Sequence, residues 1–314
     1  MAHEHESDCI IIGGGIAGLQ AAIQLGRYRH RITVIDRGYG RSTLCRSYHN
    51  VLGWPEGVSG EQLRRLGRQH ASSLGVQFVT GEAVQVKKER EDRFAVALSS
   101  SDDRYYAKKL LLATGVMDRF PLIPGLIPCL GLTVYVCPDC DGYEVTGRTT
   151  IVMGSGSTGA NMSLTLSYWT DQIVYVNHEQ KPIPENLMRS LSDAGIQVIA
   201  QPIRAVEAEE SRFHGVHLEG GHFIGGERGF IAFGGNEVYS ELAEQLGVER
   251  LENRHIVSNP RTMETNVHGV YVAGDVAVHA EQVTMAMGEG SIAAIWIHKA
   301  LLELGSDVLR SRLE

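Results

Sequence analysis

Two cysteines, Cys137 and Cys140, are separated by two residues in the stretch Cys-Pro-Asp-Cys-Asp-Gly. A pair with this spacing can close a small disulfide ring or present a dithiol. One of its thiols usually has a lowered pKa, which makes that thiol a nucleophile near neutral pH. Asp141 follows directly and is placed to exchange the thiol proton as an acid–base group. We therefore predict thiol–disulfide chemistry at this pair.

Other uses of the pair stay open from the residues alone. A zinc site needs four ligands, and because the sequence has no second close cysteine pair, Cys129 with a histidine would be an unusual set. A structural disulfide is uncommon in a cytosolic protein. His3 and His5 stand in the polar stretch 1–8, which we expect to be a frayed end rather than a metal site. We predict no metal.

The other cysteines give weaker signals. Cys9 stands in an apolar run and is expected in the core, whereas Cys45, beside Arg46, is either a reactive or an inert thiol. No role is assigned to Cys129. An odd total of five cysteines, mostly scattered, is not typical of a secreted disulfide framework. The cysteines therefore favour a cytoplasmic protein.

A glycine-rich turn follows the first apolar run of the chain. Residues 9–12 predict a strand, a helical stretch follows the turn, and residues 32–35 predict a second strand. In this order the glycines allow the turn, the approach of a pyrophosphate and the packing of the helix on the strand. The helix start would face the phosphates with unpaired amides, and the acid after the second strand would bind ribose hydroxyls. The predicted cofactor-binding residues are Gly13, Gly15, Ile16, Ala17, Gly18 and Asp36.

The same order recurs in the middle of the chain. Residues 149–153 predict a strand, a glycine-rich turn and a helical stretch follow, and residues 173–176 predict the next strand. This pattern predicts a second nucleotide-binding fold inserted into the first. Its candidate nucleotide-binding residues are Gly154, Gly156, Ser157, Thr158, Gly159, Asn177 and Glu179. Tyr168 and Trp169 are aromatic surface for a second flavin or, equally, packing residues.

Composition narrows the class of protein. At 314 residues the chain suits two domains, each with its own core. A formal net charge of -8 argues against a nucleic-acid partner. No apolar run approaches the roughly 20 residues of a membrane span, and the polar N-terminus is not a signal peptide. We expect a soluble protein without a membrane or nucleic-acid partner.

The order of these segments resembles the low-molecular-weight thioredoxin reductases over nearly the whole chain. The resemblance is carried by the first glycine loop, an Ala-Thr-Gly turn after the strand 110–112, the Cys-x-x-Cys-Asp-Gly motif, the second glycine loop, and a strand 269–272 followed by Gly-Asp. It implies an FAD-dependent disulfide oxidoreductase. The further residues that it implies at the FAD are Asn50, Ala113, Thr114, Gly115, Gly274, Asp275, Gln282, Val283 and Thr284.

The resemblance also implies roles within this site. Asp275 would hold the ribityl chain, and Asn50 would lie near the isoalloxazine ring. Cys140 would exchange electrons with the flavin, and Cys137 would react with the sulfur of a thioredoxin-like protein or another dithiol or disulfide. The helix that begins near Gln282 would stabilise negative charge on the reduced flavin. A homodimer is implied by the family only.

The sequence departs from the family where the second nucleotide would bind. The family has a basic His-Arg-Arg run after the strand, which grips the 2′-phosphate of NADPH. This chain has Asn-His-Glu-Gln-Lys at 177–181, in which Glu179 would repel a phosphate and Lys181 is the one permanent cation. Three routes stay open: NADH with Glu179 on the ribose, no nicotinamide at all, or NADPH held through Arg189 or Arg204. Glu281 likewise replaces a common arginine and removes a cation near the flavin.

These observations predict an α/β protein with two Rossmann-like, three-layer domains, the second inserted into the first. We expect an FAD domain from residues 1–116 and 246–314 and an inserted NAD(P)-binding-like domain at 120–245 that carries the cysteine pair. Short crossings would permit the domains to rotate, as the family resemblance implies.

Three functions are compatible with the sequence. The first is a thioredoxin reductase-like flavoprotein that passes electrons from FAD through Cys137 and Cys140 to a disulfide partner. The second is an FAD-dependent dithiol oxidase, which works in the opposite direction. The third is a redox-sensing binding protein with little turnover.

Overall fold

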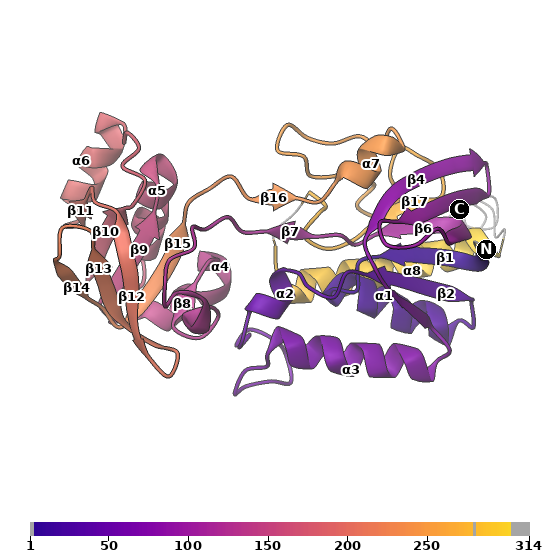
Figure 1. The fold of residues 1–314 in the computed structure, drawn as a ribbon, viewed down its shortest axis with the longest axis horizontal. Helices are drawn as coiled ribbons and strands as arrows, with labels where there is room; N and C mark the ends of the chain where they lie inside the picture. The colour runs from indigo at the N-terminus through magenta and orange to yellow at the C-terminus, as the bar shows by residue number, and fades with distance from the viewer. Residues whose placement is uncertain (1–2, 279–280, 303–314) are drawn as a thin grey trace, which may run out of the picture. The chain divides into compact units, whose positions relative to one another are not determined.

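The structure is a computed structural model that describes residues 3–278 and 281–302. Contacts divide the described residues into two compact units (Figure 1). Unit 1 takes the described residues of Met1–Thr43, Gly60–Met117 and Val238–Glu314, and unit 2 takes Leu44–Ser59 and Asp118–Glu237. Across residues 3–278 and 281–302, none of the helices is long and apolar enough to cross a membrane.

Unit 1 is built on a mixed sheet. Its strands are β1 (Glu4–Ile12), β2 (Ile32–Asp36), β3 (Gln77–Thr80), β4 (Ala83–Arg90), β5 (Arg93–Leu98), β6 (Arg104–Leu112) and β17 (Val270–Val272). Their order is β3-β2-β1-β6-β5-β4, with β17 paired to the end of β6. Neighbours are parallel except at β4, β5 and β6, which join antiparallel. The helices are α1 (Ile16–Arg27), α2 (Arg41–Leu44), α3 (Gly60–Ser73), α7 (Glu241–Gln245) and α8 (Val283–Leu301).

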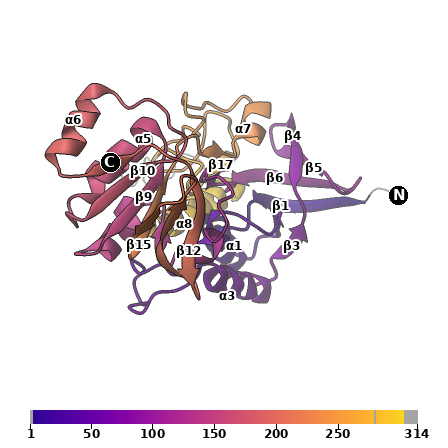
Figure 2. The same cartoon turned by 60° about the vertical axis from the view of Figure 1, so that its left-hand side comes forward.

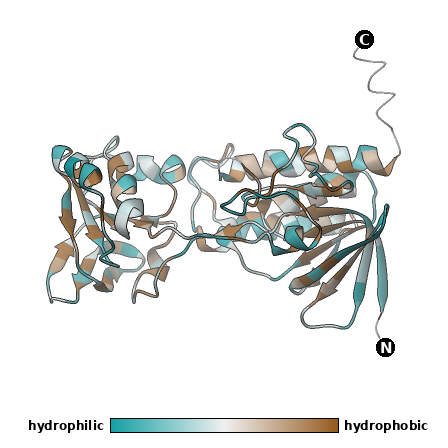
Figure 3. Ribbon diagram, turned by 90° about the horizontal axis from the view of Figure 1, so that it is seen from above, coloured by the Kyte–Doolittle hydropathy of each residue, from teal (hydrophilic) through white to brown (hydrophobic). Residues whose placement is uncertain are grey.

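The central strand β1 shows why this unit has three layers. Ile10 and Ile12 belong to an apolar cluster with residues of β4, β5 and α7, whereas Cys9 and Ile11 belong to a cluster with α1 and α8. A strand that is apolar on both faces must be covered on both sides. Figure 3 shows hydrophobic residues along the strands of the sheets. The prediction of Cys9 as a core residue is confirmed, since its side chain is fully buried.

The N-terminal stretch differs from its prediction. Residues 4–8 are not a frayed end, because β1 begins at Glu4 and pairs in parallel with β6 from Arg104 onward. The ring of His5 stacks on Tyr105 at a centroid distance of 4.8 Å. Polar composition suggested an end without structure, but the hydrogen bonds of the sheet and this ring contact extend the strand.

Unit 2 has its own parallel sheet. Its strands are β8 (Val134–Tyr135), β9 (Thr150–Gly154), β10 (Ile173–Asn177), β11 (Gln197–Ile199) and β15 (Arg228–Ala232), in the order β11-β10-β9-β15-β8. A separate antiparallel sheet holds β12 (Ile203–Glu209), β13 (Arg212–Leu218) and β14 (Phe223–Gly225). The helical elements are η1 (Ile127–Cys129), α4 (Pro138–Asp141), η2 (Gly142–Val145), α5 (Gly156–Leu166) and α6 (Glu185–Asp193).

The two faces of this parallel sheet have different covers. Val152 of β9 packs in an apolar cluster with residues of α5 and α6, and Figure 2 shows these helices beside β9 and β10. Ile151 and Met153 pack in a second cluster with residues of β12 and β13. The structure therefore has the predicted α/β architecture, with a second Rossmann-like unit inserted into the first.

The crossings between the units lie close to β7 (Val116–Met117) and β16 (Glu237–Val238), which pair with each other. The division differs from the predicted domains in two places. The residues of α7 group with unit 1, because Gln245 hydrogen-bonds to the backbone of β4. The segment 44–59 groups with unit 2 although it precedes α3 in the chain.

Candidate active site

The first glycine loop connects β1 to α1 in unit 1. Gly13 has a φ of 110°, and a Cβ added there would lie 2.1 Å from the carbonyl oxygen of Ala113. A Cβ at Gly18 would lie 1.9 Å from the carbonyl oxygen of Gly13. The turn therefore requires glycine at both positions, while a Cβ at Gly15 would meet nothing within 4 Å. Gly15 thus presents open backbone at the start of α1, where Ile16 and Ala17 form the first turn.

Other predicted FAD segments converge on this loop. The contact of Gly13 with Ala113 brings the Ala-Thr-Gly turn against it. A Cβ at Gly274 would lie 2.9 Å from the Cβ of Ala17, so the end of β17 reaches the same helix start. Thr114 and Gly115 complete the Ala-Thr-Gly turn, and the Thr114 hydroxyl donates to the Tyr239 carbonyl. Gln282 immediately precedes α8, whose first turn contains Val283 and Thr284.

Asp36 ends β2 and is buried beside the loop. Its carboxylate accepts a hydrogen bond of 3.1 Å from the Gly14 amide and pairs with Arg64 of α3 at 2.8 Å. Open backbone at Gly15, the start of α1 and a buried carboxylate form the set that an adenosine pyrophosphate requires. The residues present therefore fit FAD. Arg64 was not predicted, because no spacing rule connects α3 to the end of β2.

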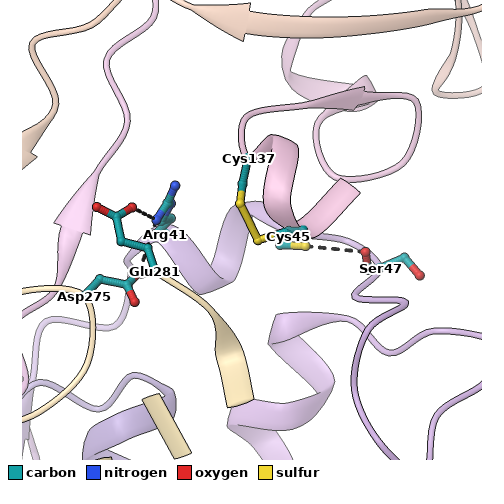
Figure 4. The surroundings of a disulfide bond; sticks show 7 residues. Arg41, Cys45, Ser47, Cys137, Asp275 and Glu281 are labelled. Carbon is teal, nitrogen blue, oxygen red and sulfur yellow. Dashed lines mark hydrogen bonds and ion pairs between the residues drawn. A yellow bond between two sulfur atoms is a disulfide. The ribbon is translucent and has the colours of Figure 1, made fainter. Parts of the chain in front are cut away.

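A charged cluster lies around Asp275. Arg41 pairs with Asp275 at 3.2 Å and with Glu281, and Figure 4 shows Arg41 between these two carboxylates. His255 lies 3.6 Å from the other oxygen of Glu281. The expectation that Glu281 removes a cation from this region is therefore incomplete, because Arg41 brings one from α2. No local sequence pattern predicts this contact, because Arg41 and Glu281 are far apart in the chain.

Cys137 and Cys140 form a disulfide at the start of α4 in unit 2, with their Cα atoms 5.3 Å apart. Pro138 occupies the first helical turn, and the amides of Cys140 and Asp141 both donate to the Cys137 carbonyl. Asp141 is buried. These contacts fix the ring that the two-residue spacing predicts, and a cysteine pair in this geometry can cycle between disulfide and dithiol.

Packing explains one of the two aromatic residues near this motif. A Cβ at Gly142 would lie 2.6 Å from the ring of Trp169, so that this ring covers the residue two places after Cys140. Tyr168 contacts Trp169 edge-on and is itself exposed. Trp169 is thus a packing residue behind the cysteine motif.

The segment 44–59 lies along the cysteine motif in unit 2. At one end Arg46 donates to the Pro128 carbonyl, and a Cβ at Gly131 would lie 2.8 Å from the Cα of Cys45. Cys45 donates through its thiol to the Ser47 carbonyl, and both residues lie in the surroundings of the disulfide (Figure 4). Asn50 lies on the same segment. Sequence reasoning marked Cys45 and Asn50 but not the anchors of the segment.

The same segment holds an unpredicted relay of polar groups. The Ser47 hydroxyl lies 3.0 Å from Nε2 of His49, and Nδ1 of His49 lies 3.4 Å from Glu144 of η2. Gly57, with a φ of 83°, packs on this pair, since a Cβ there would lie 2.2 Å from the Ser47 hydroxyl. The carboxylate orients the imidazole, which is a group able to carry a proton next to the motif.

The second glycine loop connects β9 to α5 and repeats one contact of the first. The Gly156 amide donates to the side chain of Asn177 at 3.0 Å, as Gly14 does to Asp36. The two loops differ in what lies next to the third residue of each. A Cβ at Gly156 would lie 3.1 Å from the Cβ of Lys181 and 3.3 Å from the carbonyl oxygen of Pro182. The chain itself covers the surface that Gly15 leaves open in the first loop.

The other predicted residues of the second loop are engaged in packing. A Cβ at Gly159 would lie 2.3 Å from the ring of Tyr175, and the Thr158 hydroxyl lies against Gly234. Ser157 stands in the first turn of α5. Hydrogen bonds from Arg119 and Lys181 hold the pKa of Glu179 well below its ordinary value. The residues here do not fit a dinucleotide as those of the first loop do.

Comparisons with known proteins agree with this architecture. A family model described as pyridine nucleotide-disulphide oxidoreductase matches residues 7–290. The thioredoxin reductase of Bacillus subtilis (strain 168) is 26% identical over 316 residues, which cover 97% of this chain and 98% of that protein. The crystal structure of HlmI is 29% identical with a TM-score of 0.85 and covers 99% of this chain and 98% of the other. The structure of a putative thioredoxin reductase TrxB from Bacillus anthracis is 26% identical with a TM-score of 0.82, covering 95% and 99%.

Proposed function

Since the chain belongs to the pyridine nucleotide-disulphide oxidoreductase family, we propose that it moves electrons between FAD and a dithiol or disulfide partner through Cys137 and Cys140. It is a flavoprotein disulfide oxidoreductase of the thioredoxin reductase type. The finer proposal is a thioredoxin-like protein or a small dithiol as partner and a donor other than NADPH. The homodimer that the family resemblance implies and the cytoplasmic location that the cysteines favour stay predictions.

The residues of unit 1 would hold the cofactor. FAD supplies two-electron redox chemistry when it is bound. Gly15 and the first amides of α1 would bind its pyrophosphate, and Asp36 would bind its ribose. Asp275, oriented by Arg41, would bind the ribityl chain. By family resemblance, the Ala-Thr-Gly turn and the start of α8 would lie at the flavin ring. The role of Asn50 near the ring stays a prediction.

The cysteine pair would carry the thiol steps. In the reducing direction the Cys137 thiolate attacks a partner disulfide, a mixed disulfide forms, and the partner's second sulfur leaves as a thiolate. The Cys140 thiolate then attacks the Cys137 sulfur, which closes the Cys137–Cys140 disulfide and releases the partner as a dithiol. Asp141, which directly follows Cys140, would exchange the protons of these thiols.

The observation that carries this proposal is the disulfide between Cys137 and Cys140 in the inserted unit. The buried Asp141 directly follows Cys140. We expect Cys140→Ser to retain FAD but to lose electron exchange between the flavin and an added dithiol. Flavin content and anaerobic flavin absorbance measure the two properties, and Cys129→Ser is the matched control. Turnover of a disulfide or dithiol by Cys140→Ser at the wild-type rate would contradict the proposal.

A second candidate is the dithiol oxidase, in which the same steps run in reverse. The cover on Gly156 favours it, because a unit without access for a nicotinamide leaves the dithiol as the source of electrons. A dithiol would then become a disulfide while oxygen or another acceptor takes the electrons. Hydrogen peroxide appearing in step with dithiol loss in air supports this direction, and an unchanged dithiol concentration in air with no other acceptor reduced contradicts it.

A further inference from the structure

Glu179 stands just after β10 and is held by two cationic side chains of unit 2. The two terminal nitrogens of Arg119 lie 2.8 and 3.1 Å from its two carboxylate oxygens. Lys181 Nζ lies 2.8 Å from one of the same oxygens. A forked guanidinium and an ammonium around one anion are donors that proteins use for phosphate groups.

Arg119 is fixed in this position by its own backbone contacts. Its Nε donates to the Gly234 carbonyl at 2.8 Å, and its Nη2 donates to the Phe233 carbonyl at 3.0 Å. These carbonyls follow β15, the strand beside β9. The guanidinium is therefore oriented towards the end of β10, where the carboxylate of Glu179 binds it.

The turn that carries Glu179 is closed over the glycine loop. The Asn177 side chain binds the loop through the Gly156 amide and binds the turn by donating to the Lys181 carbonyl at 2.8 Å. Residues 181 and 182 consequently lie on the outer face of Gly156. In the first loop a Cβ at Gly15 would meet nothing within 4 Å. The cover over Gly156 is therefore a feature of the turn at 177–182 and is not shared by the first unit.

We propose that Glu179 is a built-in substitute for the 2′-phosphate of NADPH, which occupies Arg119 and Lys181 and excludes that nucleotide from unit 2. A second anion brought to this place would have to displace a carboxylate already bound by two cations. The inference rests on the proposed function, because it concerns the electron donor of that reaction. It also makes Glu179 a specificity-determining residue. One interpretation of the sequence had instead made Glu179 a ribose ligand for NADH.

Removal of the carboxylate tests the inference. We expect wild-type protein to bind 2′,5′-ADP weakly by calorimetry, and Glu179→Gln to bind it at least about tenfold more tightly, because two cations become available. The gain should be much smaller for 5′-AMP, which lacks the 2′-phosphate. It should disappear in Arg119→Ala/Glu179→Gln. Glu185→Gln is the matched control, since Glu185 is an exposed carboxylate of the same unit that contacts Arg189 at 3.9 Å.

Two results would overturn the inference. One is a folded Glu179→Gln that binds 2′,5′-ADP no more tightly than the wild type does, and the other is an equal gain for 5′-AMP. Circular dichroism checks the fold, and Glu179→Ala replaces the glutamine variant if the latter does not fold. Because the readout is binding of a redox-inactive nucleotide, its failure is distinct from a failure of flavin–thiol electron exchange.

Discussion

The five cysteines of the chain occupy environments in which we expect their thiol reactivity to differ. Cys137 and Cys140 share a disulfide, and Cys45 is half-buried with its thiol donating to a backbone carbonyl. Burial raises the pKa of both Cys9 and Cys129. Since the thiolate is the reactive form, buried thiols with raised pKa values are poor nucleophiles.

We therefore predict an order of alkylation in the native, oxidised protein. Iodoacetamide at pH 8 should modify Cys45 at least about tenfold faster than Cys9 or Cys129, because Cys45 is more exposed and burial raises the pKa of the other two thiols. Peptide mapping by mass spectrometry measures the rates, and the unfolded protein, in which the three thiols should react alike, is the control. Modification of Cys129 at the rate of Cys45 would contradict the burial described for unit 2.

Residue types at the candidate site were predictable from the sequence, but their partners were not. The cysteine spacing and the acid at position 36 follow local rules that hold in many folds. Arg119 meets Glu179, and Arg64 meets Asp36, only after several strands and helices have packed. The sequence therefore predicted that Glu179 would repel a phosphate or bind a ribose, whereas the fold places two cations against it.

At the scale of elements, the closeness of α1 to α8 depends on one small residue. A Cβ at Gly290 of α8 would lie 2.3 Å from the carbonyl oxygen of Ala17 and 3.2 Å from the Ala21 amide nitrogen. Because these are backbone atoms of α1, no side chain can move aside to make room. The two helices carry the residues that we place around the flavin, so their spacing matters for the site.

We expect Gly290→Ala to be destabilising by about 1–3 kcal/mol, as overpacking in a core usually is. It should lower the Tm by several degrees and reduce the FAD content of the purified protein. Gly288→Ala is the matched control on the same helix, since a Cβ there would meet nothing within 4 Å. That variant should be neutral or slightly stabilising, because alanine favours a helix. Equal Tm values for both variants would contradict the described contact.

The sequence pattern predicted strands and helices best where apolar periodicity is strong. Residues 9–12 and 32–35 are strands as predicted, and both glycine loops lead into helices. The start of β1 was missed, since residues 4–8 are polar and are ordered by pairing with β6, about a hundred residues away in the chain. Pairing between distant segments is not a local property of either one.

At the scale of the whole molecule, one Rossmann-like unit interrupts another, and each has kept a glycine loop. Only the first loop leaves its outer face open, while the second is covered by the chain at 181–182. The family's two-unit architecture thus remains, while residues 181 and 182 lie against the second glycine loop. This difference between the loops supports the proposal of an electron donor other than NADPH.

The most direct test is anaerobic reduction of the flavin-loaded protein by three donors in separate samples. A dithiol such as dithiothreitol should bleach the flavin absorbance, and neither NADPH nor NADH should do so at a comparable rate. Cys140→Ser should resist the dithiol as well, which identifies the route. Rapid bleaching by NADPH or NADH in the absence of a dithiol would contradict the account, because it requires a working nucleotide site that the cover on Gly156 and the engagement of Glu179 exclude.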